Sequence, residues 1–240
     1  MIFAQRIVSH YIEKIRSKGA INSGPFAGVP ATEDSLQYCW RRLLGIYEFY
    51  LHDSIERAIG FNPNIIVDVG ASSGYYSIGM ASRLPRARHI AFEMQQRERD
   101  SFLRTASKIP VPIDLRAECK PKDLIEIAEE YRRGLLIMDC EGAERELLGD
   151  SVFPNLSDWI VLLEVHDWHA PGAGEEILQR FSCSHEIQIL WSRKASPNEF
   201  LSVVPWPFHY YCKGVLSRMC DEGRGGEMRF FFMVPKNLII

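Results

Sequence analysis

Residues 64–82 place the strongest constraint on the fold, because they read as a buried strand, a glycine turn and a helix in immediate succession. The run at 65–67 is short, apolar and β-branched, which is typical of a strand covered on both faces. Asp68 stands at its carboxyl end, where ligands bind in open α/β sheets. Gly70 and Gly74 allow a tight turn and let backbone amides approach a ligand. The segment therefore predicts a nucleotide-cofactor site on an α/β fold.

The glycine spacing distinguishes between cofactors. A dinucleotide fold uses G-x-G-x-x-G, whereas Ser72 stands here at the position of the second glycine. The chain also has no G-x-x-x-x-G-K-[ST] loop for a nucleoside triphosphate. S-adenosylmethionine carries no phosphate. Its amino-acid end needs backbone donors and a carboxylate for the ammonium group, and its ribose needs a carboxylate to accept two hydroxyl hydrogen bonds. Asp68 with the turn at 70–74, and Glu93 at the end of the next apolar run, can supply these groups, so the pattern favours S-adenosylmethionine and disfavours a dehydrogenase.

Strand-like and helix-like runs alternate from residue 64 onward, which predicts a doubly wound, mostly parallel sheet. The chain is expected to divide into an amino-terminal helical extension or lid at 1–60 and a cofactor-binding domain at 61–240. In the extension, an amphipathic helix at 2–17 suits either a lid or a homo-oligomer contact, and a second helix is expected from Thr32 to about Ile59. Strands are expected at 64–68, 89–93, 111–116, 135–139, 159–165, 186–191 and 228–234, and helices at 74–84, 96–108, 121–132, 143–149 and 173–182.

Composition excludes several functional classes. With 240 residues, 46% hydrophobic and 25% charged, the chain can bury a full core. A net charge of −3 and a pI near 6.2 give no general attraction to nucleic acid or to an anionic membrane. No stretch approaches the ~20 apolar residues of a membrane span. Six cysteines form no C-x-x-C pair or zinc-type spacing, so we expect free thiols in a cytoplasmic protein.

A second group of ionisable residues follows the fourth and fifth predicted strands. Because the carboxyl ends of neighbouring parallel strands meet at one edge of the sheet, these residues should converge on the cofactor cleft. Methyl transfer to oxygen needs a group that takes the hydroxyl proton, and a histidine suits this role near neutral pH. His166 is the candidate base, with Asp167 as its alternative or its orienter. The group consists of Asp139, Glu141, Glu144, Glu164, His166 and Asp167.

Other interpretations stay open at this edge. Glu144 fits equally well as an acid that stabilises a helix dipole, and His166 as a histidine held in place by hydrogen bonds. Carboxylate oxygens suit Mg²⁺, so a divalent metal held by Asp139, Glu141, Glu164 or His166 is chemically reasonable. No ligand set can be chosen from sequence alone, and no metal site is predicted.

The chain resembles the FkbM-type S-adenosylmethionine-dependent methyltransferases over about residues 62–167. D-V-G-A at 68–71 and G-Y-Y-S at 74–77 are similar to the cofactor turn of that family. D-x-E-G-x-E at 139–144 is similar to its most specific signature, and E-x-H at 164–166 to a further motif. Ser72 stands where the family usually has Asn, and Met94 where it usually has Pro.

The resemblance implies a class I, Rossmann-like sheet of seven strands, with the last strand antiparallel and inserted between the fifth and sixth. It also implies O-methylation of a hydroxyl on a small molecule, such as a sugar or a secondary metabolite. By position, Asp139 would approach the sulfonium and amino group, Glu93 with Met94 the ribose, and Glu118 with Cys119 the adenine. The methionine moiety would be surrounded by Asp68, Gly70, Ala71, Ser73, Gly74 and Tyr75.

Alternatives to a small-molecule methyltransferase make different demands on the chain. A protein or RNA acceptor would need a basic groove, which Arg41, Arg42, Arg132 and Arg133 could begin. A non-catalytic cofactor-binding or interaction module would bind cofactor without turnover. The aromatic segment 200–211 would then form a dimer surface, whereas in an enzyme it could line the acceptor pocket.

Overall fold

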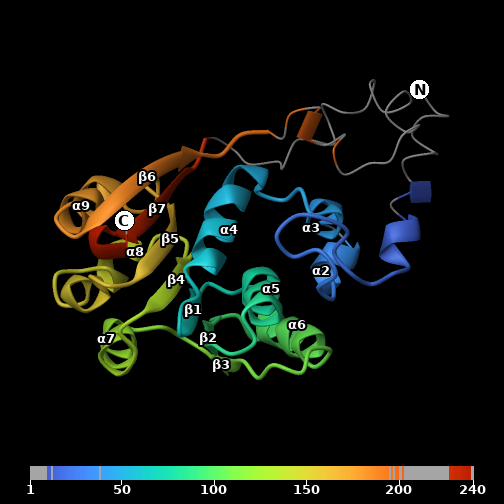
Figure 1. Cartoon of the computed structure of the whole chain (residues 1–240), viewed down its shortest axis with the longest axis horizontal. Helices are drawn as coiled ribbons and strands as arrows, with labels where there is room; N and C mark the ends of the chain where they lie inside the picture. The colour runs from blue at the N-terminus through green and yellow to red at the C-terminus, as the bar shows by residue number, and fades with distance from the viewer. Residues whose placement is uncertain are drawn as a thin grey trace.

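A seven-stranded sheet in the order β3-β2-β1-β4-β5-β7-β6 forms the centre of the molecule (Figure 1). The computed structural model describes residues 10–11, 13–37, 39–194, 196, 198–199, 202 and 227–238. Neighbouring strands from β3 to β5 run parallel, whereas β7 is antiparallel to both of its neighbours, β5 and β6. The strands are β1 (Ile65–Val69), β2 (Arg88–Phe92), β3 (Asp114–Arg116), β4 (Gly134–Met138), β5 (Ile160–Val165), β6 (His185–Trp191) and β7 (Arg229–Pro235).

The central strands are buried along their whole length. Every residue of β1, β4 and β5 is buried, as expected for apolar runs covered on both faces. β7 is buried from Phe230 onward because it lies between β5 and β6. The prediction of a seven-stranded, doubly wound sheet with an antiparallel last strand between the fifth and sixth is therefore confirmed.

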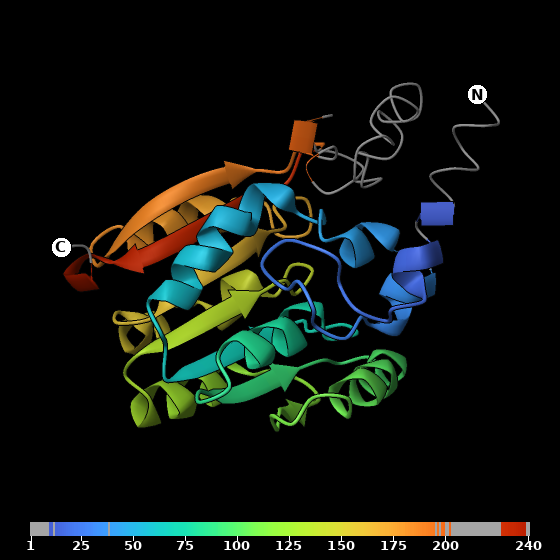
Figure 2. The same ribbon diagram turned by 45° about the vertical axis from the view of Figure 1, so that its right-hand side comes forward.

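Helices cover both faces of the sheet. One core cluster joins the sheet to α4, α5 and α6, and the other joins it to α7, α8 and α9. Figure 2 shows α4 and α5 lying over the same face of the sheet. These helices are α4 (His52–Gly60), α5 (Tyr75–Arg83), α6 (Gln96–Ala106), α7 (Pro121–Glu130), α8 (Glu144–Leu147) and α9 (Ala173–Phe181).

The amino-terminal region differs from the prediction. The single helix expected from Thr32 to Ile59 is wrong, because the chain forms α2 (Glu33–Gln37), α3 (Trp40–Leu44), the 3-10 turn η1 (Phe49–Leu51) and then α4. Gly45 ends α3 with a φ of +77°, and a Cβ there would stand 1.9 Å from the carbonyl oxygen of Ser23. Close packing against a segment about twenty residues earlier therefore decides where this helix stops.

The amino-terminal loop shares the core of the sheet. Ile21, Phe26 and Val29 belong to the same cluster as sheet residues such as Ile66 and Leu135. The division at residue 60 stays a prediction, as does a lid or oligomer role for the helix at 2–17, of which residues 2–9 and 12 lie outside the described part. In the described ranges, no helix combines the length and the apolar character needed to cross a membrane. The predictions for segment 203–226, which include most of the aromatic stretch, also fall outside those ranges.

Candidate active site

The glycine turn joins the carboxyl end of β1 to α5. Gly70 has a φ of +85° and Gly74 a φ of +95°, both in the region that favours glycine. A Cβ at Gly70 would stand only 1.7 Å from the carbonyl oxygen of Asp139, which directly follows β4. The ends of β1 and β4 therefore approach each other as closely as the backbone allows, and this approach puts Asp139 beside the turn.

The amides of the turn are occupied within the fold. Gly70 and Ala71 donate hydrogen bonds of 2.9 and 3.0 Å to the carbonyl oxygen of Phe92, the last residue of β2. Ser72, with a φ of +48°, donates through its amide to the Glu93 carboxylate at 2.8 Å. These three amides fasten the end of β2 to the turn. The role of the turn residues toward a cofactor stays a prediction.

Glu93 is held with part of its carboxylate unused. The side chain is buried, and it accepts hydrogen bonds from the amides of Ser72 at 2.8 Å and Gln95 at 2.7 Å. A carboxylate offers about four lone-pair sites, so roughly two remain for the hydroxyls of a ligand. Met94 beside it is 70% exposed and gives this side of the site an apolar surface.

Asp68 is the buried acid at the end of β1. Ser77 of α5 donates a hydrogen bond to its carboxylate. Burial raises the pKa of Asp68 to about 7, the nearby charges of Asp139 and Glu93 act in the same direction, and the Ser77 hydroxyl opposes them. A cationic group bound here would stabilise the carboxylate form and lower that pKa.

The amino-terminal region contacts the turn through a polar chain. Ser73 donates a 2.6 Å hydrogen bond to Asp34 of α2, and Asp34 pairs with Arg42 of α3 at 2.6 Å. The Arg42 guanidinium lies over the rings of Tyr47 and Tyr75, 4.4 and 5.4 Å from their centroids. Although burial opposes ionisation of Asp34, Arg42 and the hydroxyl donors keep its pKa below the usual range. Sequence reasoning missed Asp34, because only the fold brings it to the turn.

The predicted adenine contacts, Glu118 and Cys119, lie in the loop that follows β3. Glu118 is exposed and pairs with Lys120 at 3.3 Å. Cys119 is half-buried, and burial raises the pKa of its thiol to about 12, so the thiol stays protonated near neutral pH. Both have local contacts of their own, and their role toward adenine stays a prediction.

The D-x-E-G-x-E signature forms a strained turn after β4. Glu141 has a φ of +54°, a conformation uncommon for residues other than glycine, and Gly142 follows with a φ of +109°. A Cβ at Gly142 would stand 2.7 Å from the Cβ of His169. The turn brings the fully buried Glu144 back toward it, where Glu144 Oε1 accepts a 3.1 Å hydrogen bond from the Gly142 amide. Such strain is characteristic of functional turns.

His166 follows β5 and is held by this turn. Its side chain is 1% exposed, and its Nδ1 lies 2.5 Å from Glu144 Oε1, so Nδ1 carries the proton and donates it. Its Nε2 stands 3.5 Å from both Asp139 Oδ1 and Glu141 Oε2. Burial alone would lower the pKa of His166, but the Glu144 hydrogen bond and the surrounding carboxylates raise it. The same bond outweighs burial at Glu144 and lowers the pKa of that carboxyl.

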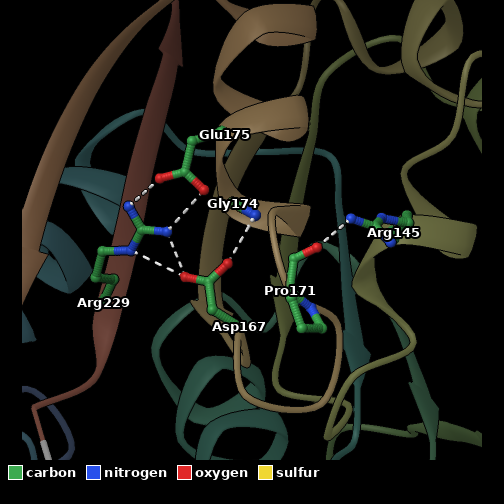
Figure 3. A network of polar contacts seen from close by, with 6 residues as sticks. All are labelled: Arg145, Asp167, Pro171, Gly174, Glu175 and Arg229. Atoms are coloured by element: carbon green, nitrogen blue, oxygen red, sulfur yellow. Dashed lines mark hydrogen bonds and ion pairs between the residues drawn. The ribbon is translucent and has the colours of Figure 1, made fainter.

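Asp167 points toward Arg229 of β7 and the start of α9, as Figure 3 shows. Its Oδ2 accepts hydrogen bonds from the Nη2 and Nε atoms of Arg229 in β7, and its Oδ1 accepts one of 3.1 Å from the Gly174 amide. Glu175 pairs with the same guanidinium at 2.7 Å. Asp167 therefore ties the start of α9 to β7, and the predicted orienter role belongs to Glu144 instead.

Three of the predicted residues also form a potential metal-binding group. Asp139, Glu164 and His166 each offer a ligand atom, and these atoms lie within 4.8 Å of one another. Glu164 and His166 are buried, whereas the Asp139 side chain is 43% exposed. Glu141, the fourth candidate ligand from the sequence, is not a member of this group, and its exposed side chain lies at the edge of it.

No protein-family model matches the chain, and no curated protein matches it. Among solved structures, it is similar to a precorrin-6y C5,15-methyltransferase from Geobacter metallireducens GS-15, with 13% identity over 74% of this chain and 84% of that chain and a TM-score of 0.49. It is also similar to an O-methyltransferase from Bacillus cereus in complex with SAH, with 13% identity over 95% and 90% and a TM-score of 0.46. A third is TomG from Streptomyces achromogenes, an O-methyltransferase involved in tomaymycin synthesis in complex with SAM, with 14% identity over 82% and 79% and a TM-score of 0.45. At these TM-scores and sequence identities, the activity of a neighbour cannot be assigned to this chain.

Proposed function

We propose that the chain is an S-adenosylmethionine-dependent methyltransferase that methylates a hydroxyl group of a small molecule. The observation that carries the proposal is the pair of buried acids, Asp68 and Glu93, on either side of the glycine turn. Asp68 is the next-to-last residue of β1, and Glu93 directly follows β2, which pairs with β1 in parallel. S-adenosylmethionine presents an ammonium group and a ribose diol, which are the groups that two such carboxylates bind.

The occupied turn amides support this cofactor over phosphate-bearing ones. A phosphate or pyrophosphate binds to free backbone N–H groups at a helix start. The amides of Gly70, Ala71 and Ser72 already donate to Phe92 and Glu93. A pyrophosphate would find these three donors already used.

The cluster beside the turn supports methyl transfer to oxygen. The acceptor oxygen attacks the methyl carbon in line with the carbon–sulfur bond, which breaks and leaves its electron pair on sulfur to give S-adenosylhomocysteine. The hydroxyl proton passes to Nε2 of His166, whose Nδ1 proton is held by Glu144. Nε2 faces the part-exposed Asp139 and the exposed Glu141, and this is the side from which an acceptor can approach.

A small acceptor is favoured over a macromolecule by the positions of the arginines. Arg42 is paired with Asp34 and stacked on tyrosine rings, so it is not presented to a partner. Arg133 directly precedes β4, at the opposite end of that strand from Asp139. Neither Arg42 nor Arg133 therefore supports a basic groove beside the site. The free thiols of the described region support the proposed cytoplasmic location.

The cofactor is tested by isothermal titration calorimetry with S-adenosylmethionine and S-adenosylhomocysteine, with NAD as the competing ligand. We expect binding to the wild type and at least ~10-fold weaker binding to Asp68→Asn and Glu93→Gln, because each loses a charge-assisted hydrogen bond of about 1.5–3 kcal/mol. Glu129→Gln, an equal charge change on the exposed side of α7, is the matched control. Binding of NAD instead, or equal affinity in all variants, would sink the proposal.

Turnover is tested with methyl-labelled cofactor and a panel of monosaccharides and phenols. We expect label transfer to an acceptor, with a rate that falls by about 10²–10⁴ in His166→Gln while cofactor affinity is unchanged. Cofactor binding with no transfer to any acceptor would favour the non-catalytic module over the enzyme.

A further inference from the structure

Asp139, Glu164 and His166 bring three metal-ligand atoms together at the carboxyl ends of β4 and β5. The parallel register pairs Met138 with Leu163, which sets the next residues, Asp139 and Glu164, side by side. All three ligand atoms lie within 4.8 Å of one another, and Nε2 of His166 is 3.5 Å from Asp139 Oδ1. Around a cation with bonds of about 2.1 Å, neighbouring ligand atoms lie roughly 3.0–3.5 Å apart. We infer that these residues form a binding site for one divalent first-row metal cation.

The ring of His166 is oriented and hydrogen-bonded as the ring of a metal-ligating histidine is. Its Nδ1 donates to Glu144, which leaves the Nε2 lone pair directed toward Asp139. The 3.5 Å separation from Asp139 and from Glu141 is too long for a normal N–H···O bond. Ligating histidines characteristically donate their other ring proton to a carboxylate, which fixes the ring and makes it more basic. Both members of this pair are buried, so the arrangement is built into the fold.

The local charge also matches a divalent cation. Four carboxylates surround one imidazole: three lie within ion-pair distance of the ring, and Glu164 completes the ligand group. Two of these carboxylates, Glu144 and Glu164, are buried. Gathering like charges out of water is unfavourable without a cation. Two oxygen ligands and one imidazole nitrogen suit Mn²⁺, Fe²⁺ or Zn²⁺ better than Ca²⁺.

The site keeps an open side. The side chains of Asp139 and Glu141 are 43% and 75% exposed, so solvent reaches this side of the group, whereas Asp139 Oδ1, His166 and Glu164 are buried. A cation there lowers the pKa of a hydroxyl bound to it. This catalytic role rests on the proposed methyl transfer. In the metal-loaded protein, Nε2 of His166 is a ligand, and the proton of the bound hydroxyl passes to the exposed carboxylate of Glu141 instead. The binding of the cation does not rest on the proposed methyl transfer.

The experiment titrates the metal-free full-length protein with MnCl₂ and follows free Mn²⁺ by electron paramagnetic resonance. We expect one Mn²⁺ per chain in the wild type and no saturable binding in Glu164→Gln. Glu144→Gln keeps all three ligands but loses the partner of Nδ1, so its affinity should fall about 10–100-fold. Glu146→Gln makes the same charge change at an exposed position of α8 and should bind as the wild type does.

Absence of saturable Mn²⁺ binding by the wild type, or equal binding by wild type and Glu164→Gln, would overturn the inference. If circular dichroism shows Glu164→Gln unfolded, Asp139→Asn replaces it, because the Asp139 side chain is partly exposed and its replacement perturbs the core less. Cofactor affinity is measured on the same samples. A protein that binds Mn²⁺ but not S-adenosylmethionine refutes the proposed function and leaves the cation site standing, and the reverse result refutes the site alone.

Discussion

Replacing Gly70 with alanine is expected to separate β1 from β4 and to destabilise the protein well beyond the strain of a left-handed residue. The added Cβ would stand 1.7 Å from the carbonyl oxygen of Asp139, and contacts below 3.0 Å are essentially never seen, so that oxygen must retreat by about 1.3 Å. The neighbours available to absorb the shift are backbone atoms, because Asp139 also donates its amide to Val69 at 2.9 Å.

The expected loss in the free energy of unfolding of Gly70→Ala has two parts. A non-glycine residue at a φ of +85° costs about 1–2 kcal/mol, and forcing extra volume into a packed backbone contact costs about 1–3 kcal/mol more. Gly28 is the matched control, because it has a φ of +83° but nothing within 4 Å of a built Cβ. Gly28→Ala should therefore lose only the first part, about 1–2 kcal/mol.

The assay is urea denaturation of both variants and the wild type, followed by tryptophan fluorescence. The free energies of unfolding are compared with one common m-value, the slope of that free energy against urea concentration. We expect Gly70→Ala to lose at least ~1 kcal/mol more than Gly28→Ala. It should also bind S-adenosylmethionine more weakly, since Asp139 moves with its carbonyl. Equal destabilisation of the two variants, within about 0.5 kcal/mol, would show that the close contact between Gly70 and Asp139 adds nothing to the stability lost in Gly70→Ala. That result would refute the reasoning.

Three further predictions concern the neighbours of the turn. Glu144→Gln should lower the rate of methyl transfer at least ~10-fold, because it weakens the hydrogen bond that holds Nδ1 of His166. Asp167→Asn should leave that rate within a few-fold of the wild type and lower only the stability of the protein. Initial rates and thermal melts distinguish the two effects. Burial raises the pKa of Asp68 to about 7 from a usual value near 3.8, so the folded protein binds this proton more tightly than the unfolded chain does. Wild-type stability should therefore fall from about pH 4 to pH 7 relative to Asp68→Asn, by up to ~4 kcal/mol; denaturation curves that stay parallel across this range would contradict the burial argument. Ser73→Ala removes the bond to Asp34 and should cost about 1 kcal/mol. Hydrogen exchange should then quicken in α2, and unchanged exchange there would mean that this bond does not hold the amino-terminal region to the turn.

The fold was largely predictable because its signals are local. The central strands β1, β4 and β5 are short, largely apolar runs, and the described helices from α5 onward lie within a few residues of the predicted bounds. The failure at 32–59 has a tertiary cause. Gly45 and Glu48 adopt positive φ values there, and packing against Ser23 breaks a pattern that by itself continues as one helix.

The sequence by itself determined which acids gather at the carboxyl edge of the sheet. Parallel strands that alternate with helices must end at one edge, so Asp68, Glu93, Asp139 and Glu164 were bound to share it. The D-x-E-G-x-E spacing likewise places an acid in a turn and another at the following helix start.

Only the tertiary structure decided how those groups pair. Asp167 binds Arg229, 62 residues further along the chain, which leaves Glu144 to hold His166. Asp34 reaches Ser73 across 39 residues. Side-chain direction depends on partners distant in sequence, and periodicity carries no information about them. The choice of orienter and the convergence of three metal ligands therefore became visible only in the folded chain.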